Sequence, residues 1–244
     1  DIEVTVYGVT QQTYERVTRR PGSYAAFRRG LGLLLDAGVR IRLKAMALRS
    51  NVHELPEIAA FCRRHTVDYF RFDPLLHLRL DGDPKRNEEI RQERLSPAEI
   101  VAIEQADDER SSALKKSCDK LIFAEFHGEA CNHLFHCGAG NASFSIGYNG
   151  VFRLCASLCH PDCTYDLRKG NLREAWEQFV PTVRNMRSGS ASYLETCRRC
   201  SIVNLCMWCP AHAYLEAGAL DAPTPYFCEV AHARAAALQE KTKR

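Results

Sequence analysis

Hydrophobic and polar positions divide the first 74 residues into short strands and longer helices. Strict alternation of apolar and polar side chains predicts a strand, whereas apolar residues that recur every three or four positions predict a helix. By these two periods we predict strands at 2–7, 39–48 and 67–74 and helices at 23–38 and 51–65. Strands that alternate with helices at this spacing form parallel sheets with right-handed crossovers. The first part of the chain is therefore expected to be α/β.

The ends of these two helices carry recognisable signals. The first helix ends at Gly38 and places four apolar residues on one face, namely Phe27, Leu31, Leu34 and Leu35. Asn51 is the predicted N-cap of the second helix, and Glu54 three residues later would complete a capping box.

The pattern changes after the third strand. Residues 75–95 are rich in charge and contain Asp-Gly-Asp-Pro, which indicates a surface loop or linker. A helix then begins at Ser96, with Pro97 in its first turn and Glu99 as an acidic third residue. Beyond this helix, cysteine and glycine become frequent. The predicted domains are 1–117 and 118–244.

The clearest local prediction in the second domain is a β-hairpin over residues 143–155. Two short alternating segments flank Asn149-Gly150, a pair that favours a type I′ turn because both central residues of that turn need positive φ. Two further helices are predicted, one at 170–180 with Asn171 and Glu174 as a capping box, and one from residue 229 to the end.

Composition and charge exclude several classes of protein. Of the 244 residues 45% are hydrophobic, which is enough for one or two cores. Lys and Arg number 33 against 30 Asp and Glu, so no basic surface for nucleic acid or a membrane is indicated. No apolar run reaches the roughly 18 residues of a membrane span. The first residues have neither the basic nor the apolar region of a signal peptide, so we expect a cytoplasmic protein. Because the chain opens on Asp1 directly with a strand pattern, we also expect a piece of a longer protein.

Twelve cysteines are many for a chain expected in a reducing compartment. Closely spaced thiols in such a compartment are more often metal ligands than disulfides. The second domain has two Cys-x2-Cys pairs and four other spaced cysteines, namely Cys197/Cys200, Cys206/Cys209, Cys131, Cys137, Cys155 and Cys228. A Cys-x2-Cys turn lets two thiolates reach one metal centre.

Three kinds of site could use these thiols. One zinc ion would use the two pairs, but it would leave four cysteines without a role, and the gap between the pairs is short for a zinc ribbon. Disulfides would need an oxidising compartment. Two four-iron clusters would use all eight cysteines. Cys209-Pro210 is also similar to the end of the cysteine run in bacterial ferredoxins, where the last cysteine ligates the other cluster.

The order of these cysteines, with Gly150 before Cys155, resembles the SPASM domain. This domain is the twin-cluster extension of radical S-adenosylmethionine (SAM) enzymes that modify peptides and proteins. The resemblance covers residues 131–228, and residues 1–75 are similar to the later part of the barrel that precedes the domain. It implies an α/β fold in which the later strands of a partial (β/α)6 radical SAM barrel are followed by a cysteine-rich α+β domain with a β-hairpin.

Carried over residue by residue, the resemblance implies two auxiliary [4Fe-4S] clusters. The implied ligands are Cys131, Cys137, Cys155 and Cys209 for the first cluster and Cys197, Cys200, Cys206 and Cys228 for the second. It also implies that Thr5, Gly8 and Asn51, near the carboxyl ends of the first two strands, contact SAM. For Asn51 the plain alternative is the helix cap.

The chain departs from the family pattern at three places. The gap before Cys209 is two residues, where the family usually has three. Ala156 stands where sulfatase-maturing members have an aspartate base, which argues against that activity. The Cys-x3-Cys-x2-Cys motif of the SAM-cleaving cluster is absent, and Cys155, Cys159 and Cys163 approach it only with a different spacing.

The full-length enzyme is therefore expected to use SAM and a third [4Fe-4S] cluster to abstract hydrogen from a peptide or protein substrate. Its electrons would come from a reductase, a ferredoxin or a flavodoxin. The present chain would bind the two auxiliary clusters, which serve electron transfer or substrate engagement. The alternatives are a stand-alone iron–sulfur module for electron transfer or peptide binding, and a structural zinc protein. Neither nucleic acid nor a membrane is expected as a partner.

The remaining cysteines carry weaker predictions. Cys62 lies on an apolar helix face and is expected in the core. Cys159 and Cys163 follow a predicted ligand in the segment CASLCHPDC, as spare ligands or as ordinary loop residues. The sequence indicates no role for Cys118.

Overall fold

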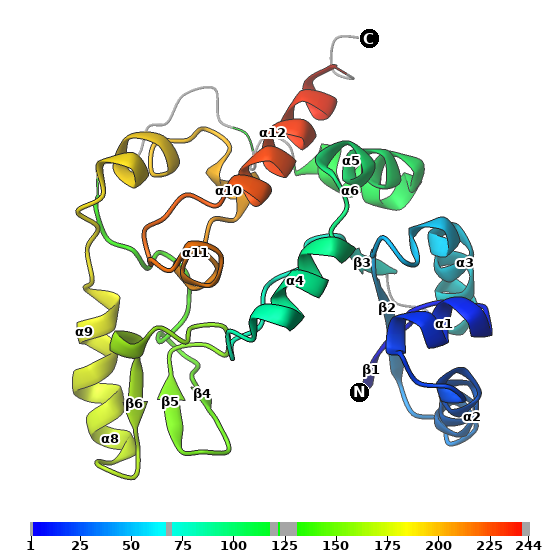
Figure 1. The fold of residues 1–244 in the computed structure, drawn as a ribbon, viewed down its shortest axis with the longest axis horizontal. Helices are drawn as coiled ribbons and strands as arrows, with labels where there is room; N and C mark the ends of the chain where they lie inside the picture. Colours follow the sequence, from blue (N-terminus) through cyan, green and yellow to red (C-terminus); the bar gives the residue numbers. More distant parts are fainter. Residues whose placement is uncertain (1, 67–69, 118–121, 123–130, 241–244) are drawn as a thin grey trace. The chain divides into compact units, whose positions relative to one another are not determined.

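The computed structural model describes residues 2–66, 70–117, 122 and 131–240. The chain divides into unit 1 (Asp1–Leu76 with Glu88–Ile100) and unit 2 (His77–Asn87 with Val101–Arg244). The fold is mixed α/β with two three-stranded sheets (Figure 1), and the described ranges contain no closed barrel. None of the helices in these ranges combines the length and apolar character needed to cross a membrane.

The sheet of unit 1 is parallel, as the alternation of strands and helices predicts. Its order is β1 (Ile2–Thr5), β2 (Ile41–Met46), β3 (Arg71–Asp73). The connecting helices are α1 (Gln11–Thr18), α2 (Ser23–Asp36), the 3-10 turn η1 (Val52–Glu54) and α3 (Leu55–His65). The amino-terminal part of the predicted third strand, at 67–69, lies outside the described residues.

One face of this sheet is covered and the other carries charge. Along β2 the side chains of Ile41, Leu43 and Ala45 are buried, and Figure 1 shows α1, α2 and α3 to one side of the sheet. On the opposite face the Glu3 carboxylate pairs with both Lys44 and Arg71. The alternating pattern in the sequence therefore corresponds to a sheet that buries one face.

Two predictions about helices need correction. Leu35 is 38% exposed, so α2 packs through Phe27, Leu31 and Leu34 instead. The segment predicted as a loop at 75–95 contains the helix α4 (Pro84–Glu93). The carboxylate of Asp83 accepts a hydrogen bond of 3.0 Å from the Arg86 amide, which is a normal helix start that the charged composition concealed.

The next helix, α5 (Pro97–Ala106), begins as predicted. The Ser96 hydroxyl accepts from the Glu99 amide at 3.3 Å, and the Glu99 carboxylate accepts from the Ser96 amide at 2.7 Å. These reciprocal bonds confirm the capping box. α6 (Asp108–Lys116) follows, with Asp107 as its N-cap.

The sheet of unit 2 contains the predicted hairpin. β4 (Ser145–Ile146) and β5 (Val151–Arg153) are antiparallel, and β6 (Thr164–Asp166), which the sequence does not predict, pairs with β5. The type I′ turn is wrong. Gly150 has a φ of +76° but Asn149 does not have positive φ, and the Asn149 side chain accepts instead from the Val151 amide. A hydrogen bond from the Gly150 amide to the Gly147 carbonyl closes a turn in which a single glycine takes the left-handed conformation.

Several of the helical segments of unit 2 share one core with Phe152 of β5. Asn171 caps the predicted helix, which the structure divides into α8 (Leu172–Glu174), the π turn η3 (Ala175–Phe179) and α9 (Val180–Arg184). Next come η4 (Tyr193–Cys197, also a π turn), α10 (Val203–Cys206), α11 (Pro210–Ala217) and α12 (Pro225–Glu240). The largest buried side chains of the core are Phe152, Leu154, Leu158, Val183 and Tyr193.

Candidate functional site

Four cysteines line one cavity of about 160 Å³ in unit 2. They are Cys197, Cys200, Cys206 and Cys228. Cys197 ends η4, and Cys200 lies in the turn that follows. Cys206 ends α10, and Cys228 lies in the first turn of α12. α10 packs against α12 (Figure 1) through a small apolar cluster of Ile202, Leu205, Ala231 and Ala235. This apolar contact brings cysteines that are 22 to 31 residues apart to one place.

The thiols around this cavity raise one another's pKa. Burial raises the pKa of Cys206 to about 12, and the nearby Cys228, Cys197 and Cys200 add to the shift. Burial also raises the pKa of Cys228 and of Cys197, with a further contribution from neighbouring thiols. These three groups are therefore neutral thiols at pH 7 when nothing is bound. A positively charged metal centre would reverse this preference, because metal ligands must be thiolates.

The cavity is larger than one metal ion requires. At the usual zinc–sulfur distance of about 2.3 Å, four sulfurs would lie within about 4 Å of one another. Within the described residues no three Cys, His, Asp or Glu side chains converge closely enough to hold one ion. A cavity of about 160 Å³ is also several times the roughly 30 Å³ that one water molecule occupies in the liquid. The cavity between the four thiols therefore has room for more than a single ion.

A second group of cysteines gathers at the start of α11. Cys209 is the residue before this helix, and burial raises its pKa, with added contributions from Cys155 and Cys137. The backbone amides of His212 and Ala211 oppose that shift, because they favour a negative charge on the sulfur. Three cysteines from distant parts of the sequence therefore lie near one another.

Cys131, the fourth residue expected in this second group, has other contacts. Its sulfur lies 2.8 Å from Nδ1 of His133, and its carbonyl accepts a hydrogen bond of 2.9 Å from Arg198. Burial raises the pKa of Tyr193 to about 12, with small contributions from both Cys197 and Cys131. Cys131 therefore lies near Tyr193.

Met207 separates the two groups of cysteines. It ends α10 with a φ of 53°, a left-handed conformation that is rare for a residue other than glycine. Cys206 before this turn lies in the cavity with Cys228, whereas Cys209 after it lies near Cys155. The second Cys-x2-Cys pair thus contributes one cysteine to each group.

The cysteines without a predicted ligand role are mostly buried. Cys62 is fully buried in the core of unit 1, as predicted, and burial raises its pKa to about 12. Cys163 is also fully buried, with its sulfur 3.7 Å from that of Met186. All cysteines in the described ranges are free thiols, and Cys118 lies outside these ranges.

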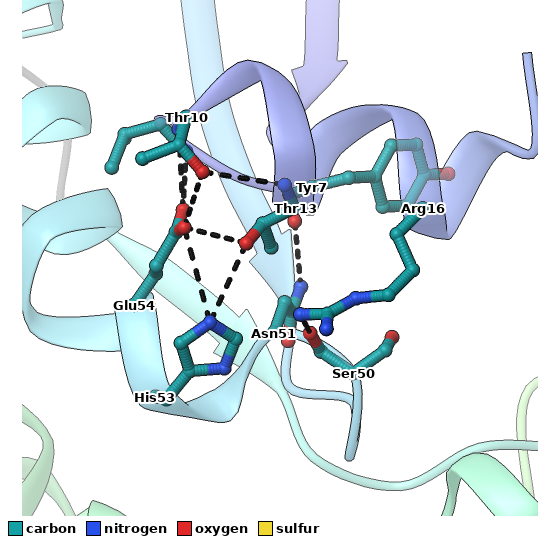
Figure 2. A network of polar contacts seen from close by, with 9 residues as sticks. Tyr7, Thr10, Thr13, Arg16, Ser50, Asn51, His53 and Glu54 are labelled. Atoms are coloured by element: carbon teal, nitrogen blue, oxygen red, sulfur yellow. Dashed lines mark hydrogen bonds and ion pairs between the residues drawn. The ribbon is translucent and has the colours of Figure 1, made fainter. Parts of the chain in front are cut away.

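In unit 1, Asn51 joins the loops that follow β1 and β2 (Figure 2). Its side-chain nitrogen donates to the carbonyls of Tyr7 and Met46, both at 3.0 Å, and its oxygen accepts from the Leu48 amide at 2.8 Å. The side chain is fully buried. The predicted N-cap is therefore wrong, because the amide of Asn51 is used by these three backbone groups and makes no capping bond.

Glu54, the other half of the predicted capping box, binds the loop after β1 instead. Its carboxylate accepts from the amides of Val9 and Thr10 and, at 2.5 Å each, from the hydroxyls of Thr10 and Thr13. Burial raises the pKa of Glu54, but these hydrogen bonds together outweigh it and lower the pKa to about 2. His53 extends the network, since its Nε2 lies 3.4 Å from the Thr13 hydroxyl (Figure 2).

The sequence reasoning missed Thr10, Thr13 and the true partner of Glu54. Thr10 is the N-cap of α1 and accepts from the Thr13 amide, which its residue type could have indicated. No local signal reveals a carboxylate that lies more than 40 positions away in the sequence.

The three residues expected to contact SAM lie at or beyond the carboxyl ends of β1 and β2. Thr5 ends β1. Gly8 packs so closely that a Cβ there would lie 2.9 Å from the Tyr14 amide nitrogen. Parallel sheets bind ligands at this edge. The side-chain nitrogen and oxygen of Asn51 are already hydrogen-bonded to backbone groups. The contact between Asn51 and SAM stays a prediction.

Compared with known protein families and with curated proteins, the chain matches none.

Proposed function

We propose that this chain is the carboxyl-terminal portion of a radical SAM enzyme of the SPASM type, which modifies a peptide or protein. In this proposal Cys197, Cys200, Cys206 and Cys228 hold one auxiliary [4Fe-4S] cluster. The single observation that supports it best is the cavity that these four thiols line. The cavity is larger than one ion needs, and buried thiols of raised pKa require a positively charged centre to become ligands.

The second auxiliary cluster of the proposal would use Cys137, Cys155, Cys209 and Cys131. The closeness of the first three supports this set. The backbone amides at the start of α11 would stabilise a thiolate at Cys209. Cys131 would have to exchange its contact with His133 for the cluster.

Unit 1 has the role of the later part of a partial (β/α)6 barrel in this proposal. Its three parallel strands and the polar network beyond their carboxyl ends are what a ligand site of such a barrel requires. Thr5, Gly8 and Asn51 would then lie beside SAM. Because the chain has no Cys-x3-Cys-x2-Cys motif, it would bind iron and sulfide but would not cleave SAM by itself.

The auxiliary clusters would supply electron transfer or a binding position for the peptide substrate. The residues of the chain would bind the clusters, exclude water and set the reduction potential through burial and hydrogen bonds. The electron donor would be a reductase, a ferredoxin or a flavodoxin.

Anaerobic reconstitution with iron and sulfide tests the proposal. Two four-iron clusters require about eight iron and eight sulfide per chain. Cys228→Ala should bring both counts to about half, because one ligand of one cluster is lost. Cys62→Ala is the matched control, since this buried thiol lies in unit 1 and should leave both counts unchanged.

Other results would contradict the proposal. A colourless chain that binds one zinc ion and no sulfide would identify a structural zinc protein. Equal iron and sulfide counts in Cys228→Ala and the wild-type chain would remove this cysteine from the ligand set.

A further inference from the structure

The cavity lined by four cysteines has few polar groups in its wall. Among the residues that the structure describes, its lining contains four polar side chains besides the thiols and no Lys, Arg, Asp or Glu. The four are Thr196, Trp208, Thr224 and His232. Two of them are already engaged. The Thr196 hydroxyl donates to the Ser192 carbonyl, and the Trp208 ring nitrogen donates to the Ala222 carbonyl at 3.0 Å.

The other two polar side chains, those of Thr224 and His232, are available. Thr224 is only 3% exposed, yet its hydroxyl has no hydrogen-bond partner among the residues that the structure describes. Because Thr224 lines the cavity, this hydroxyl can donate to a group bound there. The His232 ring likewise has no hydrogen bond or ion pair within the described part of the chain, and this residue is exposed although it lines the cavity.

Both residues lie on the same face of α12 as a predicted ligand. Thr224, Cys228 and His232 are spaced by four residues, and side chains at this spacing lie above one another on a helix. The Cys228 amide bonds to the Thr224 carbonyl at 3.0 Å, which continues the helical pattern back to Thr224. All three side chains line the same cavity. Cys228 is therefore flanked on α12 by a hydrogen-bonding side chain on each side.

We propose that Thr224 and His232 donate hydrogen bonds to the cluster or to its cysteine sulfurs and so raise its reduction potential. The inference rests on the proposed function, because it needs a cluster in this cavity. On reduction the cluster takes one electron from the donor and gains one negative charge. Hydrogen-bond donors stabilise the more negative state. The described part of the cavity lining holds no Lys or Arg.

A redox titration of the reconstituted chain with dithionite tests this, with electron paramagnetic resonance as the readout of the reduced clusters. Thr224→Val removes the hydroxyl at nearly constant volume, and His232→Phe removes the ring N–H groups. In each variant the ratio of reduced to oxidised cluster, measured at the wild-type midpoint, should fall by about tenfold. For one electron this corresponds to about 59 mV. The potential of the other cluster should not change.

Conservative variants distinguish hydrogen bonding from packing. Thr224→Ser and His232→Gln keep a donor and should restore most of the wild-type reduction potential. If the two residues acted through packing alone, the potentials of these variants would be as low as those of Thr224→Val and His232→Phe. Full iron and sulfide counts with unchanged potentials in Thr224→Val and His232→Phe would overturn this inference and leave the proposed function intact. Loss of iron in either variant would also overturn it, since the residue would then hold the cluster itself. Absence of iron and sulfide from the wild-type chain would reject the proposed function.

Discussion

The side-chain amide of Asn51 donates a hydrogen bond of 3.0 Å to the carbonyl of Tyr7, a residue 44 positions earlier in the chain. With its bonds to Met46 and Leu48, it satisfies three backbone groups in two loops that no regular secondary structure pairs. Buried backbone groups must be paired, so one side chain fixes the loops after two neighbouring strands.

Asn51→Ala should therefore lower the free energy of unfolding of unit 1 by about 3 kcal/mol, because it leaves up to three buried backbone groups unpaired. Urea unfolding followed by far-ultraviolet circular dichroism measures this loss. Gln12→Ala, an exposed change on α1, should stay within about 0.5 kcal/mol of the wild type. A loss no larger than that of Gln12→Ala would show that water replaces the amide in these loops.

Glu54 should make unit 1 sensitive to acid. Its hydrogen bonds lower its pKa from 4.5 to about 2 on folding, despite burial. The stabilisation is therefore fully present above pH 4.5 and is lost as the pH falls toward 2. A pKa difference of this size corresponds to about 3 kcal/mol.

Glu54→Gln should remove this stabilisation, so the wild type and the variant should differ by about 3 kcal/mol at pH 7 and converge near pH 2. Urea unfolding over a series of pH values measures the difference. Glu57→Gln, an exposed change on α3, should remain parallel to the wild type across the range. A difference between Glu54→Gln and wild type that does not depend on pH would contradict the assigned pKa.

Local signals in the sequence predicted much of the fold but few long-range contacts. Alternation revealed the parallel strands of unit 1, and the caps at Ser96 and Asn171 were found from residue types alone. Asn51 and Glu54 also have the spacing of a capping box, and there the prediction failed. Both side chains are bound more strongly by loops around residues 7–13, and such competition cannot be read from four consecutive residues.

The grouping of the cysteines shows the same limit. Spacing indicates that thiols can share a metal centre, and only the family resemblance implied that Cys206 and Cys209 belong to different groups. The left-handed residue Met207 sends Cys206 and Cys209 to different groups, and a methionine gives no sequence signal for positive φ.

Met207→Gly should stabilise unit 2. A left-handed conformation costs a residue with a Cβ about 1–2 kcal/mol, while glycine costs about 0.5–1 kcal/mol through the unfolded chain. The expected net gain is about 0.5–1 kcal/mol, since the Met207 side chain is 75% exposed and loses little packing. Both tryptophans, Trp176 and Trp208, lie in unit 2, so tryptophan fluorescence during urea unfolding reports this change. Met207→Ala keeps the Cβ and should show no gain; an equal gain in both variants would exclude backbone strain as the cause.

A buried ion pair joins α5 to α12 in unit 2. Arg234 donates to both carboxylate oxygens of Glu104 at 2.7 and 2.8 Å, and the two side chains are 7% and 2% exposed. Arg168 and Asp166 form a pair of the same bidentate geometry, at 2.8 and 2.9 Å, but the Arg168 side chain is 70% exposed. Arg110 also donates to Glu104, at 2.8 Å. The two pairs therefore differ in burial and in this second arginine.

Arg234→Ala should lower the free energy of unfolding by about 2–3 kcal/mol, because it removes two charge-assisted hydrogen bonds from a buried carboxylate that keeps only Arg110. Arg168→Ala should cost at most about 1 kcal/mol, because water replaces the lost bonds. The double variant Glu104→Leu with Arg234→Met should recover most of the loss, since both fully buried charges are gone and Arg110, at 24% exposure, reaches water. Tryptophan fluorescence during urea unfolding measures all three. If the double variant were as unstable as Arg234→Ala, the loss would come from packing between α5 and α12, and the pair itself would contribute little to stability.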